Sequence, residues 1–147
     1  DEPTGFLAPE TKILMQLKKA NLLVAGAAVQ HYGTALAEEQ EALMRMADMA
    51  MEVYVLESAL LKTQRLAGRL SEEENQRRGL LATLQAHHAA EKCLSAGREV
   101  IMGLPENDEQ RMMLMGLRRF TKTPSVNLKN LRRDVAQYVL EKGKYPY

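Results

Sequence analysis

The chain has 147 residues, of which 46% are hydrophobic and 27% are charged, and its formal net charge is +1 at pH 7. This length suits a single domain with its own hydrophobic core. The nearly balanced charge excludes a general electrostatic attraction to nucleic acid, so we expect no nucleic-acid partner. Contact with an acidic membrane would need a local group of basic residues.

A single cysteine, Cys93, excludes an internal disulfide and a cysteine-rich zinc site. This usage favours a reducing compartment, so we expect the chain in a bacterial cytoplasm or on the mitochondrial matrix side. The most continuous apolar run, residues 22–29, is far shorter than the ~18 residues that span a bilayer. The acidic start Asp1-Glu2-Pro3 differs from a signal peptide.

The first half of the chain predicts two long helices. Residues 1–8 lack periodicity, which indicates a linker or arm. Apolar residues then recur at three- and four-residue spacing and predict a helix over residues 9–31. Gly33 interrupts this pattern, and residues 34–38 are expected to cap a second helix that ends near Ala67.

The second helix has the longest amphipathic pattern in the chain. Its expected core stripe consists of Ala42, Met46, Met49, Val53, Leu56 and Leu60. Its expected solvent stripe consists of Glu41, Arg45, Asp48 and Glu52. The spacing therefore predicts that this helix buries one side and exposes a charged side.

Three further helices are predicted in the second half. Ser71 followed by Glu74 has the form of a capping box and predicts a third helix that continues to about residue 102. A shorter helix is expected from residue 107 or 108 to residue 120, and a last one over residues 125–142. Residues 143–147 are expected to form a loose tail.

No segment alternates apolar and polar residues as a half-buried strand would. We therefore predict an all-α protein, an up-down bundle of about four to five helices within one domain over residues 9–142. Three long helices joined by short turns are expected to lie antiparallel, and the last two helices can complete the bundle.

The candidates for catalytic or metal chemistry are few. His87, His88 and Glu91 resemble metal ligands, but a helical metal site needs a second such motif, so we favour solvated histidines and expect no metal. Cys93 lies among alanines and is interpreted as core filler rather than a nucleophile. Glu57, near the core stripe, is either a base with a raised pKa or, as we favour, a partner of Arg or Lys.

Basic residues gather near the junction of the last two predicted helices, beside Met112, Met113 and Met115, which we expect to be exposed. Such a group could contact acidic lipid or phosphates, although a solvated face is the simpler interpretation. The sequence contains no glycine-rich phosphate-binding motif. The candidate interaction patch consists of Arg118, Arg119, Lys122, Lys129, Arg132 and Arg133.

The stretch from His31 to Tyr54 contains a spaced set of residues: Tyr32-Gly33, Leu36, Gln40 and the sequence Met-Ala-Asp-Met-Ala over residues 46–50. This set resembles a segment in the C-terminal helical domain of the acyl-CoA dehydrogenase family. Members of that family have Arg-x-x-Phe-Gly-x-x-(Leu/Ile)-x-x-x-Gln followed by Leu-Ala-Asp-Met-Ala. The resemblance is clearest over the first three predicted helices.

Two departures from the family pattern concern the flavin. Val29 occupies the position of the Arg that contacts the cofactor in catalytic members, and valine cannot donate a hydrogen bond to a pyrophosphate. Residues 101–105, Ile-Met-Gly-Leu-Pro, replace a glutamine and a Gly-Gly turn that also contact flavin. No counterpart of the catalytic glutamate is found. The resemblance thus implies neither catalytic nor cofactor-binding residues in this chain.

A degenerate domain of this kind resembles the extra C-terminal domain in the very-long-chain branch of the family. The resemblance implies a non-catalytic accessory domain of a parent dehydrogenase that uses FAD to oxidise long acyl-CoA thioesters in fatty-acid β-oxidation. Its implied partners are the rest of the parent chain, a second copy in a homodimer, and a peripheral membrane. The alternative is a stand-alone helical module that binds a protein or an acidic membrane through the basic patch.

Overall fold

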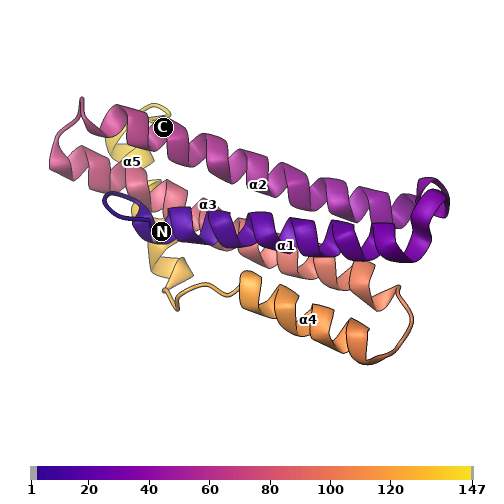
Figure 1. The fold of residues 1–147 in the computed structure, drawn as a ribbon. Coiled ribbons are helices and arrows are strands. Elements are labelled where there is room, and N and C mark those ends of the chain that lie inside the picture. The colour runs from indigo at the N-terminus through magenta and orange to yellow at the C-terminus, as the bar shows by residue number, and fades with distance from the viewer. Residues whose placement is uncertain (1–2, 147) are drawn as a thin grey trace.

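The computed structural model describes residues 3–146, which fold into five α-helices and one 3-10 helix (Figure 1). Within these residues there is no strand, and the predicted all-α class is confirmed. Across the same residues, no helix combines the length and the apolarity needed to cross a membrane. The elements are α1 (Ala8–Tyr32), η1 (Gly33–Glu38), α2 (Gln40–Ala67), α3 (Glu72–Met102), α4 (Asp108–Phe120) and α5 (Leu128–Lys142).

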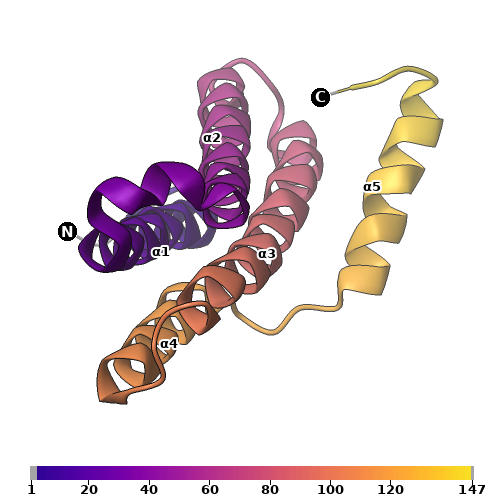
Figure 2. The same cartoon turned by 90° about the vertical axis from the view of Figure 1, so that its right-hand side faces the viewer.

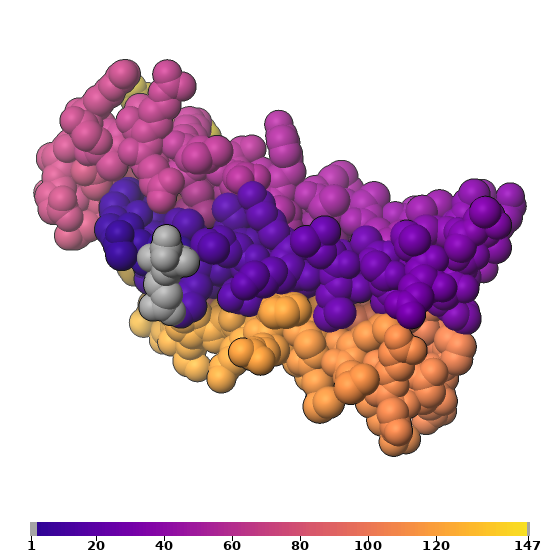
Figure 3. All heavy atoms as spheres, viewed as in Figure 1, coloured from indigo at the N-terminus to yellow at the C-terminus, as the bar shows by residue number. Residues whose placement is uncertain are grey.

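Helices α1 to α4 form an up-down bundle. α1, α2 and α3 pack against one another, and α4 packs against α1 and α3. In the space-filling view α1 lies between α2 and α4 (Figure 3). α5 stands outside this bundle and packs against α3 (Figure 2). The last helix therefore does not complete the bundle as the sequence allowed.

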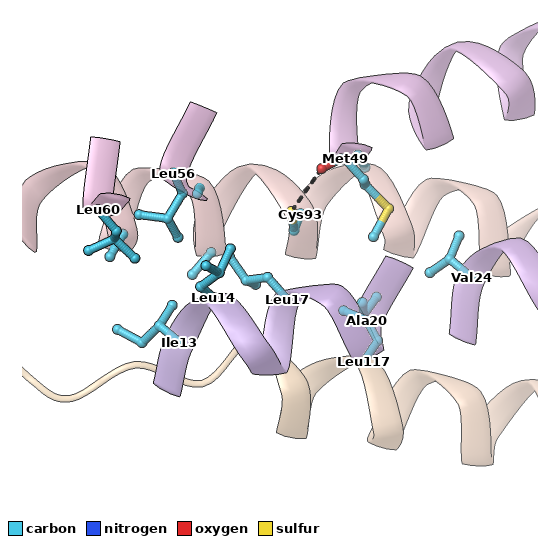
Figure 4. Packing of buried hydrophobic residues seen from close by; sticks show 14 of the residues in the cluster. Ile13, Leu14, Leu17, Ala20, Val24, Met49, Leu56, Leu60, Cys93 and Leu117 are labelled. Atoms are coloured by element: carbon cyan, nitrogen blue, oxygen red, sulfur yellow. Dashed lines mark hydrogen bonds between the residues drawn. The ribbon is translucent and has the colours of Figure 1, made fainter. Parts of the chain in front are cut away.

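The core lies along the contact of α1, α2 and α3 (Figure 4). Its largest fully buried aliphatic residues include Leu17, Leu56 and Leu60. α3 contributes mostly small residues, which let neighbouring helices approach closely. The buried small residues of α3 are Gly79, Ala82, Ala86, Ala89, Ala90, Cys93, Ala96 and Gly97.

Side-chain caps fix where three helices begin. Ser71 accepts a hydrogen bond from the Glu74 backbone N–H at 3.2 Å, as the predicted capping box requires. Asn107 likewise caps α4 by accepting from the Gln110 N–H at 2.8 Å. Asn127 caps α5, so this helix begins at Leu128 and the predicted start at residue 125 was three residues too early.

The start of α2 differs from the sequence prediction. Residues 34–38 belong to η1 and do not cap the helix, because Glu39 occupies the N-cap without a side-chain hydrogen bond. Gly33 makes the turn between α1 and η1 at a φ of 53°, a left-handed conformation that glycine adopts without strain. The bend after α1 therefore depends on this glycine.

The described parts of the predicted N-terminal arm and C-terminal tail include buried residues. Of the predicted arm, Asp1 and Glu2 lie outside the described residues, but Leu7 is buried in the core cluster and α1 already begins at Ala8. Of the predicted tail, Tyr147 lies outside the described residues. The tail returns toward the α2 and α3 ends, and Pro146 is buried (Figure 2).

Polar and cation–π contacts attach α5 to α3. Tyr138, the buried residue of α5, lies under the Arg77 guanidinium and the Lys142 ammonium, each 5.5 Å from the ring centroid. Lys142 also pairs with Glu74 at 3.0 Å, and Arg77 pairs with Glu141. A single buried ring with surrounding ion pairs thus holds this helix beside the bundle.

Candidate functional site

Two positions correspond to flavin contacts in the family pattern, and neither offers a free hydrogen-bond donor for a flavin. Val29 lies near the end of α1 with its apolar side chain exposed. In the turn after α3, the Gly103 N–H donates to the Glu99 and Val100 carbonyls, at 3.2 Å each. The Gln110 side chain donates to the carbonyls of Ile101 and Leu104 at 3.1 and 2.8 Å. This internally bonded turn and an apolar Val29 do not fit a flavin pyrophosphate.

The histidine cluster does not converge on one point. His87 is buried, whereas His88 is exposed and directs Nε2 toward Glu52 Oε1 of α2 at 3.8 Å. Within residues 3–146, no group of three or more His, Cys, Asp or Glu side chains is placed to hold a metal ion. The His87, His88 and Glu91 spacing therefore does not create a metal centre in the described part of the chain.

Cys93 lies in the middle of the core, as predicted. Its side chain is fully buried, and Sγ lies 3.8 Å from the Met49 carbonyl oxygen. Burial, and secondarily the charge of Glu52, raise the pKa of this thiol to about 12. The thiol is thus protonated at neutral pH and shielded from solvent, which excludes a nucleophilic role in this conformation.

Glu57 forms an ion pair with a lysine, as the sequence favoured. Lys18 of α1 donates from Nζ to Glu57 Oε1 at 2.6 Å, and both side chains are partly exposed. The carboxylate is therefore paired across the α1–α2 contact instead of desolvated in the core. A carboxylate that acts as a general base in an apolar site needs burial that this position lacks.

The six residues of the basic patch are all exposed, and none forms an ion pair with a carboxylate of residues 3–146. They divide between α4, α5 and the connection between them, and α4 and α5 do not contact each other. Met112 and Met115 are exposed beside the α4 arginines, but Met113 packs against the core, contrary to expectation. A common binding role for the six stays a prediction.

One surface was missed by the sequence analysis. Of the stripe expected to face solvent, Arg45 reaches Glu99 of α3 at 2.6 Å and Glu52 accepts from Gln85 of α3 at 3.4 Å. These charges therefore line the α2–α3 seam, and the outermost side of α2 exposes apolar residues such as Met51 and Tyr54. The signal was present in the sequence as a second set of apolar residues at helical spacing.

Comparison with known proteins agrees with this architecture. The sequence profile described as "Acyl-CoA dehydrogenase, C-terminal domain" matches residues 16–119, which extend from α1 to the end of α4. The chain belongs to the acyl-CoA dehydrogenase family. The predicted family resemblance is thereby confirmed and includes α4, while α5 follows the matched region.

Two acyl-CoA dehydrogenase relatives extend the match to nearly the whole chain. A probable acyl-CoA dehydrogenase of Bacillus subtilis (strain 168) is 34% identical over 146 residues, covering 99% of this chain and 25% of the relative. The crystal structure of an acyl-CoA dehydrogenase complexed with FAD from Bacillus anthracis superposes with a TM-score of 0.90 at 31% identity, covering 98% of this chain and 25% of that one. The chain spans about a quarter of the length of both relatives.

Proposed function

We propose that the chain is a non-catalytic accessory domain at the C-terminal end of a longer, FAD-dependent acyl-CoA dehydrogenase. The observation that carries this proposal is a retained family bundle whose flavin-contact positions hold an apolar Val29 and the self-bonded turn after α3. Glu57, the carboxylate considered as a base, is occupied by Lys18. The bundle is thus suited to packing and not to catalysis.

The flavin and the catalytic base would come from the rest of the longer chain. That part would oxidise long-chain acyl-CoA thioesters to trans-2-enoyl-CoA in fatty-acid β-oxidation, as the very-long-chain branch of the family does. The accessory domain would support folding or assembly of a homodimer in a bacterial cytoplasm or on the mitochondrial matrix side. The FAD-complexed relative, about four times as long, supports the flavin part of this proposal.

An activity assay tests the proposal. The purified chain, supplied with FAD, palmitoyl-CoA and an artificial electron acceptor, is expected to show no dehydrogenation above the protein-free blank. The longer dehydrogenase that carries these residues serves as the positive control and is expected to turn over palmitoyl-CoA. Turnover by the isolated chain would overthrow the non-catalytic role, and absence of any longer chain would overthrow the accessory role.

A second candidate function rests on the basic patch. The six exposed cations, which have no carboxylate partner among residues 3–146, lie partly beside exposed Met112 and Met115 and suit peripheral contact with an anionic membrane. This contact would add to the accessory role and would place the dehydrogenase beside a lipid surface. If the domain acted on its own instead of as part of a longer chain, binding through the basic patch would be its main function.

Vesicle sedimentation tests the membrane contact. Reversing Arg118, Arg119, Arg132 and Arg133 to Glu is expected to abolish salt-sensitive binding to phosphatidylserine-containing vesicles, because each basic residue near such a surface contributes about 1 kcal/mol. A matched control reverses four exposed basic residues outside the patch, namely Lys19 of α1, Lys62 and Arg65 of α2, and Arg69 of the turn after α2. Equal loss in the two variants, or no binding by the unaltered chain, would contradict the candidate.

A further inference from the structure

The outermost side of α2 is apolar over most of the helix. We call this surface the outer face; all its residues are exposed, and Tyr54 and Met51 retain 72% and 58% of their accessible surface. At helical rise it extends roughly 27 Å. The outer face consists of Leu43, Met44, Ala47, Ala50, Met51, Tyr54, Val55, Ser58 and Leu61.

The charged side chains of the same segment lie on the flanks of α2 and not on the outer face. Arg45 and Glu52 contact α3, and Glu57 pairs with Lys18 of α1. α2 is therefore packed on one side, bordered by ion pairs and hydrogen bonds on both flanks, and uncharged on the outer face. A helix that is apolar on two opposite sides is typical of a helix covered on both. Contiguous exposed apolar surface of this kind marks a contact surface.

The apolar surface continues from α2 onto α1. A groove of about 480 Å³ lies between the two helices, lined by Leu22 and Ala25 of α1 and by Met46, Ala50 and Val53 of α2, with Lys18, Asn21 and Met49 also at its wall. Leu22 retains 74% of its accessible surface at the rim. Ala50 belongs to both the groove and the outer face, so the two form one surface.

We propose that the outer face and this groove are covered by the dehydrogenase part of the same longer chain, as an interface between domains. This inference rests on the proposed function. The matched relatives have about three quarters of their length outside the matched region, which supplies a large neighbour. A tethered neighbour is held at high effective concentration and needs no electrostatic steering, which suits the uncharged outer face.

Other occupants fit the surface less well. An anionic membrane would require basic residues among the apolar ones, and the outer face has none between Leu43 and Leu61. Extended uncharged apolar contact is characteristic of permanent interfaces. The dehydrogenase part, which would be synthesised with the domain and remain attached to it, meets this requirement.

Thiol labelling in two contexts tests the inference. Tyr54→Cys is made in the isolated chain and in the longer dehydrogenase, and modification by a maleimide is followed by peptide mass spectrometry. We expect labelling to be at least about tenfold slower in the longer chain, because a covered thiol reacts only during local opening. Leu61→Cys repeats the measurement on the same face in case one substitution itself loosens the contact.

The matched control is Leu140→Cys on α5, which is exposed and lies outside the bundle. Its labelling rate is expected to be equal in the two contexts. Equal rates for Tyr54→Cys and Leu61→Cys in both contexts would overturn the inference and leave the accessory role intact. Slow labelling in an isolated chain that is dimeric by light scattering would also overturn it, since a second copy would then be the occupant.

Discussion

Leu17→Ala is expected to lower the free energy of unfolding of the isolated chain by about 2–5 kcal/mol. Leu17 has no exposed surface and lies in the core among α1, α2 and α3 (Figure 4). The substitution removes buried methyl groups and leaves a cavity that closely packed helices close only in part. Urea denaturation followed by circular dichroism measures the loss.

The control for this prediction is Leu22→Ala, the same substitution in the same helix. Leu22 is 74% exposed, so its truncation is expected to change the free energy of unfolding by less than about 0.5 kcal/mol. Similar losses for both variants would contradict the assignment of the α1 core side. They would place Leu22 in a contact that the isolated chain itself makes.

Gly97→Leu is expected to lower the free energy of unfolding by about 1–3 kcal/mol or to displace α4 from the bundle. A Cβ atom at Gly97 would lie 2.9 Å from Leu117 Cδ1 and 3.1 Å from Val24 Cγ2. α1 and α4 thus approach α3 at this position through the absence of a side chain, and a leucine has no space there. Thermal unfolding by circular dichroism provides the measurement.

Gly26→Leu is the matched control for the second prediction. A Cβ atom at Gly26 meets no atom within 4 Å, and leucine favours the helix over glycine by up to about 1 kcal/mol. This variant is therefore expected to be as stable as the unaltered chain or more stable. If Gly97→Leu were tolerated as well as Gly26→Leu, the inference that α1 and α4 approach α3 closely at Gly97 would be wrong.

Local signals predicted the fold well because helix formation is largely local. The capping box at Ser71 set the start of α3, and the three- and four-residue spacing that included Leu17 and Leu56 set the buried sides of α1 and α2. The burial of Cys93 followed from the small residues around it. These features need only the period of a helix and the chemistry of its ends.

The position of α5 and the role of the outer face were not predictable in the same way. Helical spacing shows which residues share a side but not which neighbour covers that side. Arg45 and Glu52 were expected to face solvent, yet they reach α3, and the uncharged side around Met51 faces outward. The same limit applies to Lys129 and Arg132, whose separation from the α4 arginines depends on the path of residues 121–127.

A member of a flavoenzyme family can keep the family bundle while its flavin-contact positions hold residues that do not suit a flavin pyrophosphate. The family bundle depends on apolar spacing, which this chain keeps, whereas flavin contact depends on a few donors. Val29 removes one donor, and the turn at Gly103 uses its hydrogen bonds internally. Packing and cofactor binding thus rest on different residues, so the first can persist without the second.

The most direct test of this account measures bound flavin in the purified chain. The chain is incubated with excess FAD and desalted, and its visible flavin absorbance is compared with protein concentration. The Bacillus anthracis dehydrogenase, whose crystal structure contains FAD, is the positive control. We predict no flavin retained by the chain after desalting, and retention of one FAD per chain would contradict the account.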